Sequence, residues 1–104
     1  MLVKVNVPLK TLDGQTMKDN VDGQAVDATV RAAIVNSVLA PVQKESGIDK
    51  VKKFNLAQRV YDKDEVELTA EEISLIKTCI GENFAPIVVG QVWNLLEGKD
   101  GLER

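Results

Sequence analysis

The 104-residue sequence contains no histidine and only one cysteine, Cys79. The missing histidine excludes Ser-His-Asp triads, Cys-His pairs and histidine metal sites. One cysteine cannot close an internal disulfide, so the fold must rest on its hydrophobic core. Cys79 adjoins Ile80 in a helical pattern. We expect it to be buried and structural, because a reactive cysteine needs an accessible, electropositive setting.

Long apolar runs and ligand-binding motifs are also missing from the sequence. No stretch approaches the ~20 apolar residues that span a bilayer, and residues 1–7 lack the basic region and apolar run of a signal peptide. The glycine patterns that cradle phosphate are absent, and the acidic loops lack the ligand spacing of a calcium loop. We therefore predict a non-enzymatic protein of the cytoplasm. It should not associate with a membrane and should have no cofactor, metal or catalytic site.

The composition is that of an ordinary folded domain. Hydrophobic residues make up 44% of the chain and charged residues 28%. This balance and the length of the chain predict a single domain over residues 1–104. The net charge of −3 does not create the positive field that draws proteins to nucleic acid.

The N-terminal part has the pattern of β-structure. Apolar residues alternate with polar ones from Val3 to Leu9, which is typical of a half-buried strand. Asp13-Gly14 supplies the backbone angles of a tight turn, so we predict a β-hairpin over residues 1–20. The polar residues at 19, 20, 22 and 23 are interpreted as a loop.

The rest of the chain has the periodicity of α-helices. We predict helices over 27–40, 48–62, 70–81 and 86–97, with Asp27 as the N-cap of the first and Pro41 just beyond its end. Thr69 and Glu72 form a capping box at the start of the third, and Gly81 suits its end. The fold class is therefore α+β, an N-terminal hairpin followed by a bundle of about four helices.

In the second predicted helix, the core stripe is assigned to Val51, Phe54 and Ala57, widened by Leu56, Val60 and Tyr61. The segment 44–63 holds six basic and three acidic residues, whereas the rest of the chain has a net charge of −6. It could contact nucleic-acid phosphates or an acidic protein, or form a solvated helix face. The candidate nucleic-acid contacts are Lys50, Lys52, Lys53 and Arg59.

The last predicted helix carries no charge from Pro86 to Leu96. Its apolar residues extend nearly all round the helix, which is typical of burial on more than one side. It is either the central core helix or a core helix whose outer face enters a subunit interface. In the second case the protein is a homo-oligomer and the candidate contacts are Val89, Val92, Trp93 and Leu96, with Trp93 as the anchor.

Three segments of the C-terminal half resemble small proteins encoded by tailed bacteriophages and prophages. They are FNLAQRVY at 54–61, VELTAEEI at 66–73 and APIVVGQVWNLLE at 85–97. Most proteins of that kind have no known function, so the resemblance implies no site residues. It implies a phage or prophage origin and action in the bacterial host cytoplasm or the virion.

These observations lead to two hypotheses about function. The first is a phage- or prophage-encoded interaction protein that self-associates and binds a protein partner in virion assembly or host takeover. The alternative is a nucleic-acid-binding accessory factor that uses the basic segment 44–63.

Overall fold

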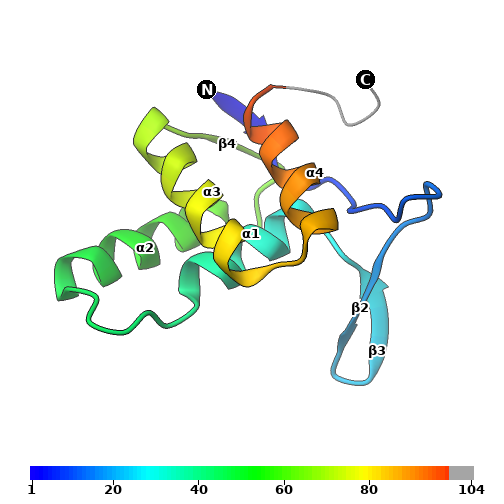
Figure 1. The fold of residues 1–104 in the computed structure, drawn as a ribbon, viewed down its shortest axis with the longest axis horizontal. Helices are drawn as coiled ribbons and strands as arrows, with labels where there is room; N and C mark the ends of the chain where they lie inside the picture. Colours follow the sequence, from blue (N-terminus) through cyan, green and yellow to red (C-terminus); the bar gives the residue numbers. More distant parts are fainter. Residues whose placement is uncertain (99–104) are drawn as a thin grey trace.

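A computed structural model describes residues 1–98 of the chain (Figure 1). The elements in chain order are β1 (Leu2–Lys4), β2 (Lys18–Val21), β3 (Gln24–Asp27), α1 (Val30–Leu39), α2 (Gly47–Val60), β4 (Glu65–Glu67), α3 (Ala70–Asn83) and α4 (Pro86–Leu96). Early strands followed by four helices confirm the predicted α+β class.

The N-terminal segment is extended and alternates as predicted, with Val3, Val5 and Leu9 buried. Its strand partner is distant in sequence, however. β1 pairs antiparallel with β4, and Val3 lies opposite Val66. This pairing fixes the start of the chain beside the segment that connects α2 to α3.

The hairpin predicted over residues 1–20 is displaced along the chain. A turn forms where it was expected, and the Gly14 amide donates to the Thr11 carbonyl at 3.0 Å. Of the Asp13-Gly14 pair, however, only Gly14 has a positive φ, 89°, and the pairing beside the turn is limited to a single bridge between Lys10 and Thr16. The sustained hairpin is β2–β3, which includes residues that we interpreted as a loop. Its two-residue turn, Asp22-Gly23, has φ angles of 53° and 81°, the positive values that tight hairpin turns require.

The first two helices begin at side-chain caps, and the cap of α1 differs from the predicted one. The N-cap of α1 is Thr29, whose hydroxyl accepts a hydrogen bond from the Ala32 amide at 3.1 Å. Asp27, the predicted cap, instead ends β3, where it pairs with Lys18. Ser46 caps α2 in the same way. Each hydroxyl satisfies an amide that the first helical turn leaves without a backbone partner.

The third helix begins at the predicted capping box. The Thr69 hydroxyl accepts from the Glu72 amide at 3.1 Å, and the Glu72 carboxylate accepts from the Thr69 amide at 2.9 Å. Arg59 of α2 also donates to this carboxylate and thereby lowers the pKa of Glu72. That contribution to stability is present at neutral pH and is lost as the pH falls through the lowered pKa.

Helix α3 extends to Asn83, past its predicted end. Gly81 therefore lies inside the helix and does not terminate it. A Cβ atom at Gly81 would lie 4.0 Å from the Trp93 ring, so this glycine faces α4.

Helix α1 lies at the centre of the molecule, between α2 and α3, and α4 packs against α3 (Figure 1). Pro86 occupies the first turn of α4 as predicted, where a missing amide costs nothing. The largest fully buried side chains are Ile34, Leu68, Ile76, Ile80, Leu96, Val5, Val38, Val60 and Val92. One core thus joins the N-terminal segment, β4 and all four helices.

Replacing Thr69 with alanine should lower the free energy of unfolding by about 1 kcal/mol, because first-turn amides of α3 lose their acceptor. Urea denaturation of the variant and the wild type measures the difference. Thr78→Ala is the control, because the Thr78 hydroxyl donates to the Ser74 carbonyl within the same helix and caps no helix end. An unchanged midpoint for Thr69→Ala would contradict a stabilising cap.

Candidate functional site

The outward face of α2 differs from the one that the sequence pattern predicts. The buried residues of this helix are Lys53, Leu56, Ala57 and Val60. Leu56, Ala57 and Val60 were expected in the core, but Val51, Phe54 and Tyr61 are exposed. The helix is rotated relative to the prediction, and a lysine occupies the place of an apolar core residue.

Lys53 enters the buried face because its charge has a partner. The ammonium lies 2.5 Å from a carboxylate oxygen of Glu45, in the loop between α1 and α2, and the two side chains are only 11% and 12% exposed. The hydrogen bond to Glu45 raises the pKa of Lys53. The aliphatic stem of a lysine can cover apolar surface while its charged end is neutralised at the rim.

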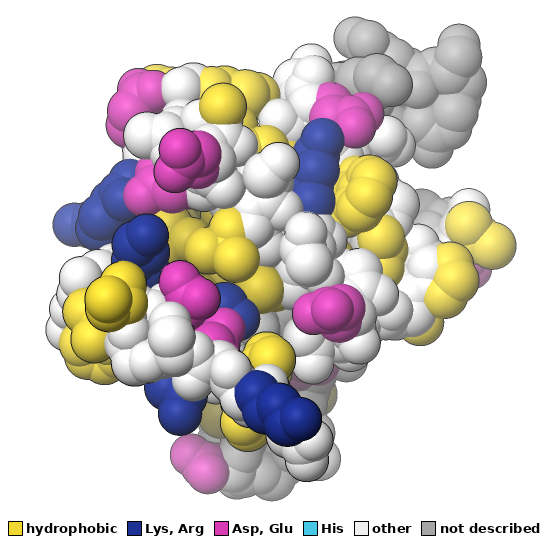
Figure 2. Space-filling model, turned by 60° about the vertical axis from the view of Figure 1, so that its left-hand side comes forward, with side chains coloured by type: hydrophobic (Ala, Val, Ile, Leu, Met, Phe, Trp, Pro, Cys, Tyr) yellow, Lys and Arg dark blue, Asp and Glu magenta, His cyan; other side chains and the backbone are white. Residues whose placement is uncertain are grey.

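The rotation leaves three large apolar side chains on the outside of α2. Ile48, Val51 and Phe54 are 72%, 58% and 52% exposed, and their spacing of three residues aligns them along one side of the helix. We call these three residues the α2 stripe. At about 100° per residue, Lys50 and Lys52 lie on opposite sides of it. Figure 2 brings the α2 end of the molecule forward and shows hydrophobic and basic side chains interspersed there.

The four basic residues proposed as nucleic-acid contacts do not act as one group. Lys53 pairs with Glu45, and Arg59 pairs with Glu72 and donates to the Glu67 carbonyl. Lys50 and Lys52 are exposed, and neither forms an ion pair within residues 1–98. Of the four, Lys50 and Lys52 are therefore the ones whose charge faces outward without an ion pair among the described residues.

The predicted contacts on α4 separate into core and surface residues. Val92 and Leu96 are buried in the core, so the surface of the single chain does not present them to a partner. Val89 is half-buried against the core and Trp93 remains 39% exposed. An interface through Val89 and Trp93 stays a prediction.

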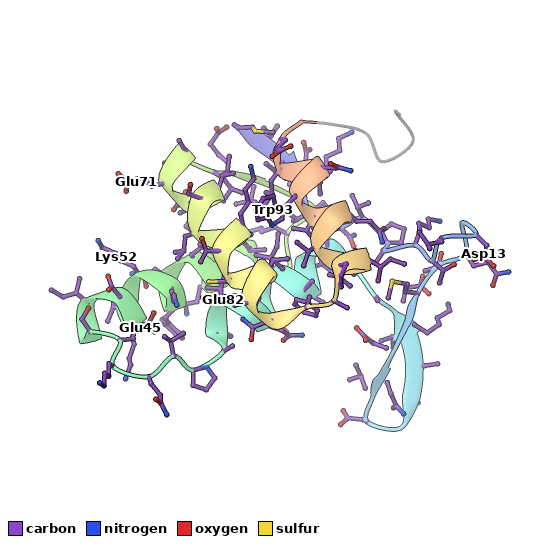
Figure 3. All side chains as sticks on the ribbon, viewed as in Figure 1. Asp13, Glu45, Lys52, Glu71, Glu82 and Trp93 are labelled. Carbon is purple, nitrogen blue, oxygen red and sulfur yellow. The ribbon has the colours of Figure 1, made fainter. Side chains whose placement is uncertain are left out.

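Trp93 lies between α3 and α4 (Figure 3). Its indole Nε1 donates to the Lys77 carbonyl at 3.2 Å, and the Lys77 ammonium lies 5.4 Å from the ring centroid. Lys77 also pairs with Glu97 at 2.9 Å. The polar group and one face of the indole are therefore already engaged within the chain, which makes Trp93 a weaker anchor for a partner than the α2 stripe.

No protein-family model, curated protein or solved structure matches this chain. Across residues 1–98, no helix is long and apolar enough to cross a membrane, and acidic and cysteine side chains form no group of three that could hold a metal ion.

Cys79 is buried, as predicted. Burial raises the pKa of its thiol, and the nearby charge of Lys53 offsets only part of this effect. A thiol with a raised pKa is mostly protonated at neutral pH and is a poor nucleophile. The side chain therefore serves the packing of α3.

The sequence held a signal for the α2 stripe. Ile48, Val51 and Phe54 repeat every third residue, and we assigned the last two to the core. The competing pattern of Lys53, Leu56, Ala57 and Val60 has equally good helical spacing, but it begins with a lysine. Only the position of Glu45 explains why that lysine can be buried.

Proposed function

We propose that this chain is a non-enzymatic interaction protein that binds a protein partner through the α2 stripe. The observation that carries the proposal is the exposure of Ile48, Val51 and Phe54 on one side of a helix whose other side is packed. Single exposed apolar residues are common, but an aligned group on a small domain marks an interaction surface.

The chemistry of the surface favours a protein over a nucleic acid. A nucleic acid could pair its phosphates with Lys50 and Lys52, but the apolar residues between them would add nothing to its affinity. Affinity for nucleic acid grows with the number of phosphates neutralised. A protein surface with apolar residues at its centre and carboxylates at its edge would match both features. We therefore favour an acidic, partly apolar protein partner.

The resemblance to phage and prophage proteins suggests where such a partner is met. The chain would act in the cytoplasm of a bacterial host or within a virion, during virion assembly or host takeover. The exposure of the α2 stripe supports the choice of surface, and the resemblance supports this setting.

Replacing Val51 with glutamate should remove partner binding while the chain stays folded. The change puts a charge at the centre of the α2 stripe, where binding would bury it without a partner. Wild-type and variant chains carrying the same tag would be purified from phage-infected host cells, and the proteins bound to each would be quantified.

The control is Leu12→Glu, which adds the same charge at a fully exposed leucine in the turn at the other end of the molecule. We expect the control to retain what the wild type binds and Val51→Glu to lose it, with unchanged circular dichroism for both. Equal binding by Val51→Glu and the wild type would refute a role for the α2 stripe.

A further inference from the structure

The β2–β3 hairpin projects from the body of the molecule, at the end opposite α2 (Figure 1). All eight of its strand residues are exposed. Within residues 1–98 the two strands pair only with each other in their sheet. An isolated two-stranded hairpin is at best marginally stable in water. The β2–β3 hairpin would therefore be stabilised if another surface covered it.

The strand register gives the hairpin one apolar face. Asp19 lies opposite Val26, and Val21 lies opposite Gln24. Directly opposite residues share a face and successive pairs alternate between faces. Val21 and Val26 therefore lie together on one face with Asp19, whereas the ion pair between Lys18 and Asp27 lies on the other.

We infer that the α2 stripe of one chain binds the valine-bearing face of the β2–β3 hairpin of a second copy. This inference rests on the proposed function and names its partner. Both surfaces have apolar residues at the centre. Asp19 and Asp22 would supply the carboxylates that match Lys50 and Lys52.

Charge selects this pairing over the other ways in which two copies could associate. The hairpin, residues 18–27, holds one lysine and three aspartates, and the ion pair between Lys18 and Asp27 leaves the charges of Asp19 and Asp22. On α2, Lys53 and Arg59 are paired with Glu45 and Glu72, so the cations beside the α2 stripe are Lys50 and Lys52. Packing α2 against α2, or hairpin against hairpin, would bring like charges together, which is unfavourable. Only the mixed contact joins opposite charges.

The two surfaces are also matched in length. A strand of four residues is about 13 Å long, and Ile48 to Phe54 spans about 9 Å along the helix. A contact of this size belongs to the weak, transient class of interfaces. We therefore expect association that depends on protein concentration and weakens with salt.

The positions of the two surfaces determine the kind of assembly. The α2 stripe and the hairpin lie at opposite ends of the molecule, so a chain cannot satisfy its own stripe with its own hairpin (Figure 1). Two copies could exchange both contacts as a closed dimer, or each copy could use its stripe for one neighbour and its hairpin for another. Such head-to-tail contacts close into a ring or continue as an open chain.

Mixing two inactive variants tests this arrangement. Val21→Thr/Val26→Thr removes the apolar hairpin face but keeps β-branched residues, and Val51→Glu disables the α2 stripe. Light scattering should give an average mass that rises with concentration for the wild type and the mass of a single chain for each variant. Each variant should weaken association by about tenfold or more. An equimolar mixture should form a two-chain complex that grows no further, because it holds one intact stripe and one intact hairpin.

Ala25→Thr is the matched control, since it introduces the same residue on the opposite face of the hairpin, and it should assemble like the wild type. Amide NMR shifts of the wild type give a second measurement, independent of any variant. Shifts that change with concentration only in 18–27 and 47–60 would support the inference, and shifts confined to other segments would overturn it.

Three further results would overturn the inference: a wild type that stays a single chain at all concentrations, a double-threonine variant that assembles like the wild type, or a mixture without a two-chain complex. The proposed function would survive these results if Val51→Glu still loses a partner that the wild type binds. It would fail separately if Val51→Glu keeps every wild-type partner.

Discussion

Replacing Leu96 with alanine should lower the free energy of unfolding by about 2–5 kcal/mol, the cost of deleting a buried leucine side chain and leaving a cavity. Leu96 is 2% exposed, whereas Leu12, the control position, is 96% exposed. Leu12→Ala should therefore change stability by less than about 0.5 kcal/mol. Urea denaturation of both variants gives the comparison.

The same experiment separates the core from an interface at the end of α4. Truncating a core residue lowers the stability of the chain by the same amount at all protein concentrations. A residue that stabilises through a subunit contact makes the denaturation midpoint rise with concentration. If the loss in Leu96→Ala disappears at low protein concentration, then Leu96 is an interface residue and our placement of it in the core is wrong.

Local signals in the sequence predicted several features of the fold correctly. The capping box at Thr69, the turn at Asp13-Gly14 and Pro86 in the first turn of α4 each depend on residues close together in the chain. The alternation from Val3 to Leu9 likewise indicated which side chains are buried.

The hairpin was misplaced because its selection depends on distant contacts. The sequence contains two Asp-Gly pairs, at 13–14 and 22–23, and each is a good turn by itself. The first does not organise a sustained hairpin because the strand before it pairs with β4, more than sixty residues away in the chain. No turn signal carries that information.

The face of α2 was misjudged for a related reason. Sequence patterns count Lys53 as polar and place it outside, which favours Val51 and Phe54 as core residues. The structure buries Lys53 because Glu45 neutralises it. The sequence therefore contained the α2 stripe as a pattern but did not decide that it faces outward, because that depends on this ion pair. The apolar hairpin face depends on the strand register, which no local signal gives.

Replacing Lys53 with methionine should destabilise the chain, because the side-chain stem is kept but Glu45 loses its cation. Breaking a fully buried ion pair costs about 3–5 kcal/mol. Glu45 and Lys53 also line a surface hollow between the end of α1 and the start of α2, so water can reach the remaining carboxylate. We therefore expect a loss of about 2 kcal/mol, less than for a fully buried pair.

A double-mutant cycle with Glu45→Gln isolates the contribution of the pair. The double variant should lose less stability than the sum of the two single variants, because no unpaired charge remains. Lys52→Met is the matched control on the exposed side of the helix and should change stability by less than about 0.5 kcal/mol. Additive losses would show that Lys53 and Glu45 are not coupled.

The pH dependence of stability in the wild type and Lys53→Met shows whether the charge of Lys53 is stabilising. Since the folded state raises the pKa of Lys53, the stabilisation is complete below the ordinary lysine pKa of about 10.4. It is lost as the pH rises through the higher pKa of the folded state. The difference in stability between the wild type and Lys53→Met should therefore be constant from neutral pH to about pH 10 and narrow above it.

A difference that persists undiminished in strong alkali would mean that the lysine acts through packing and not through its charge. In that case the orientation of α2, and with it the exposure of the α2 stripe, would depend on the shape of the Lys53 side chain.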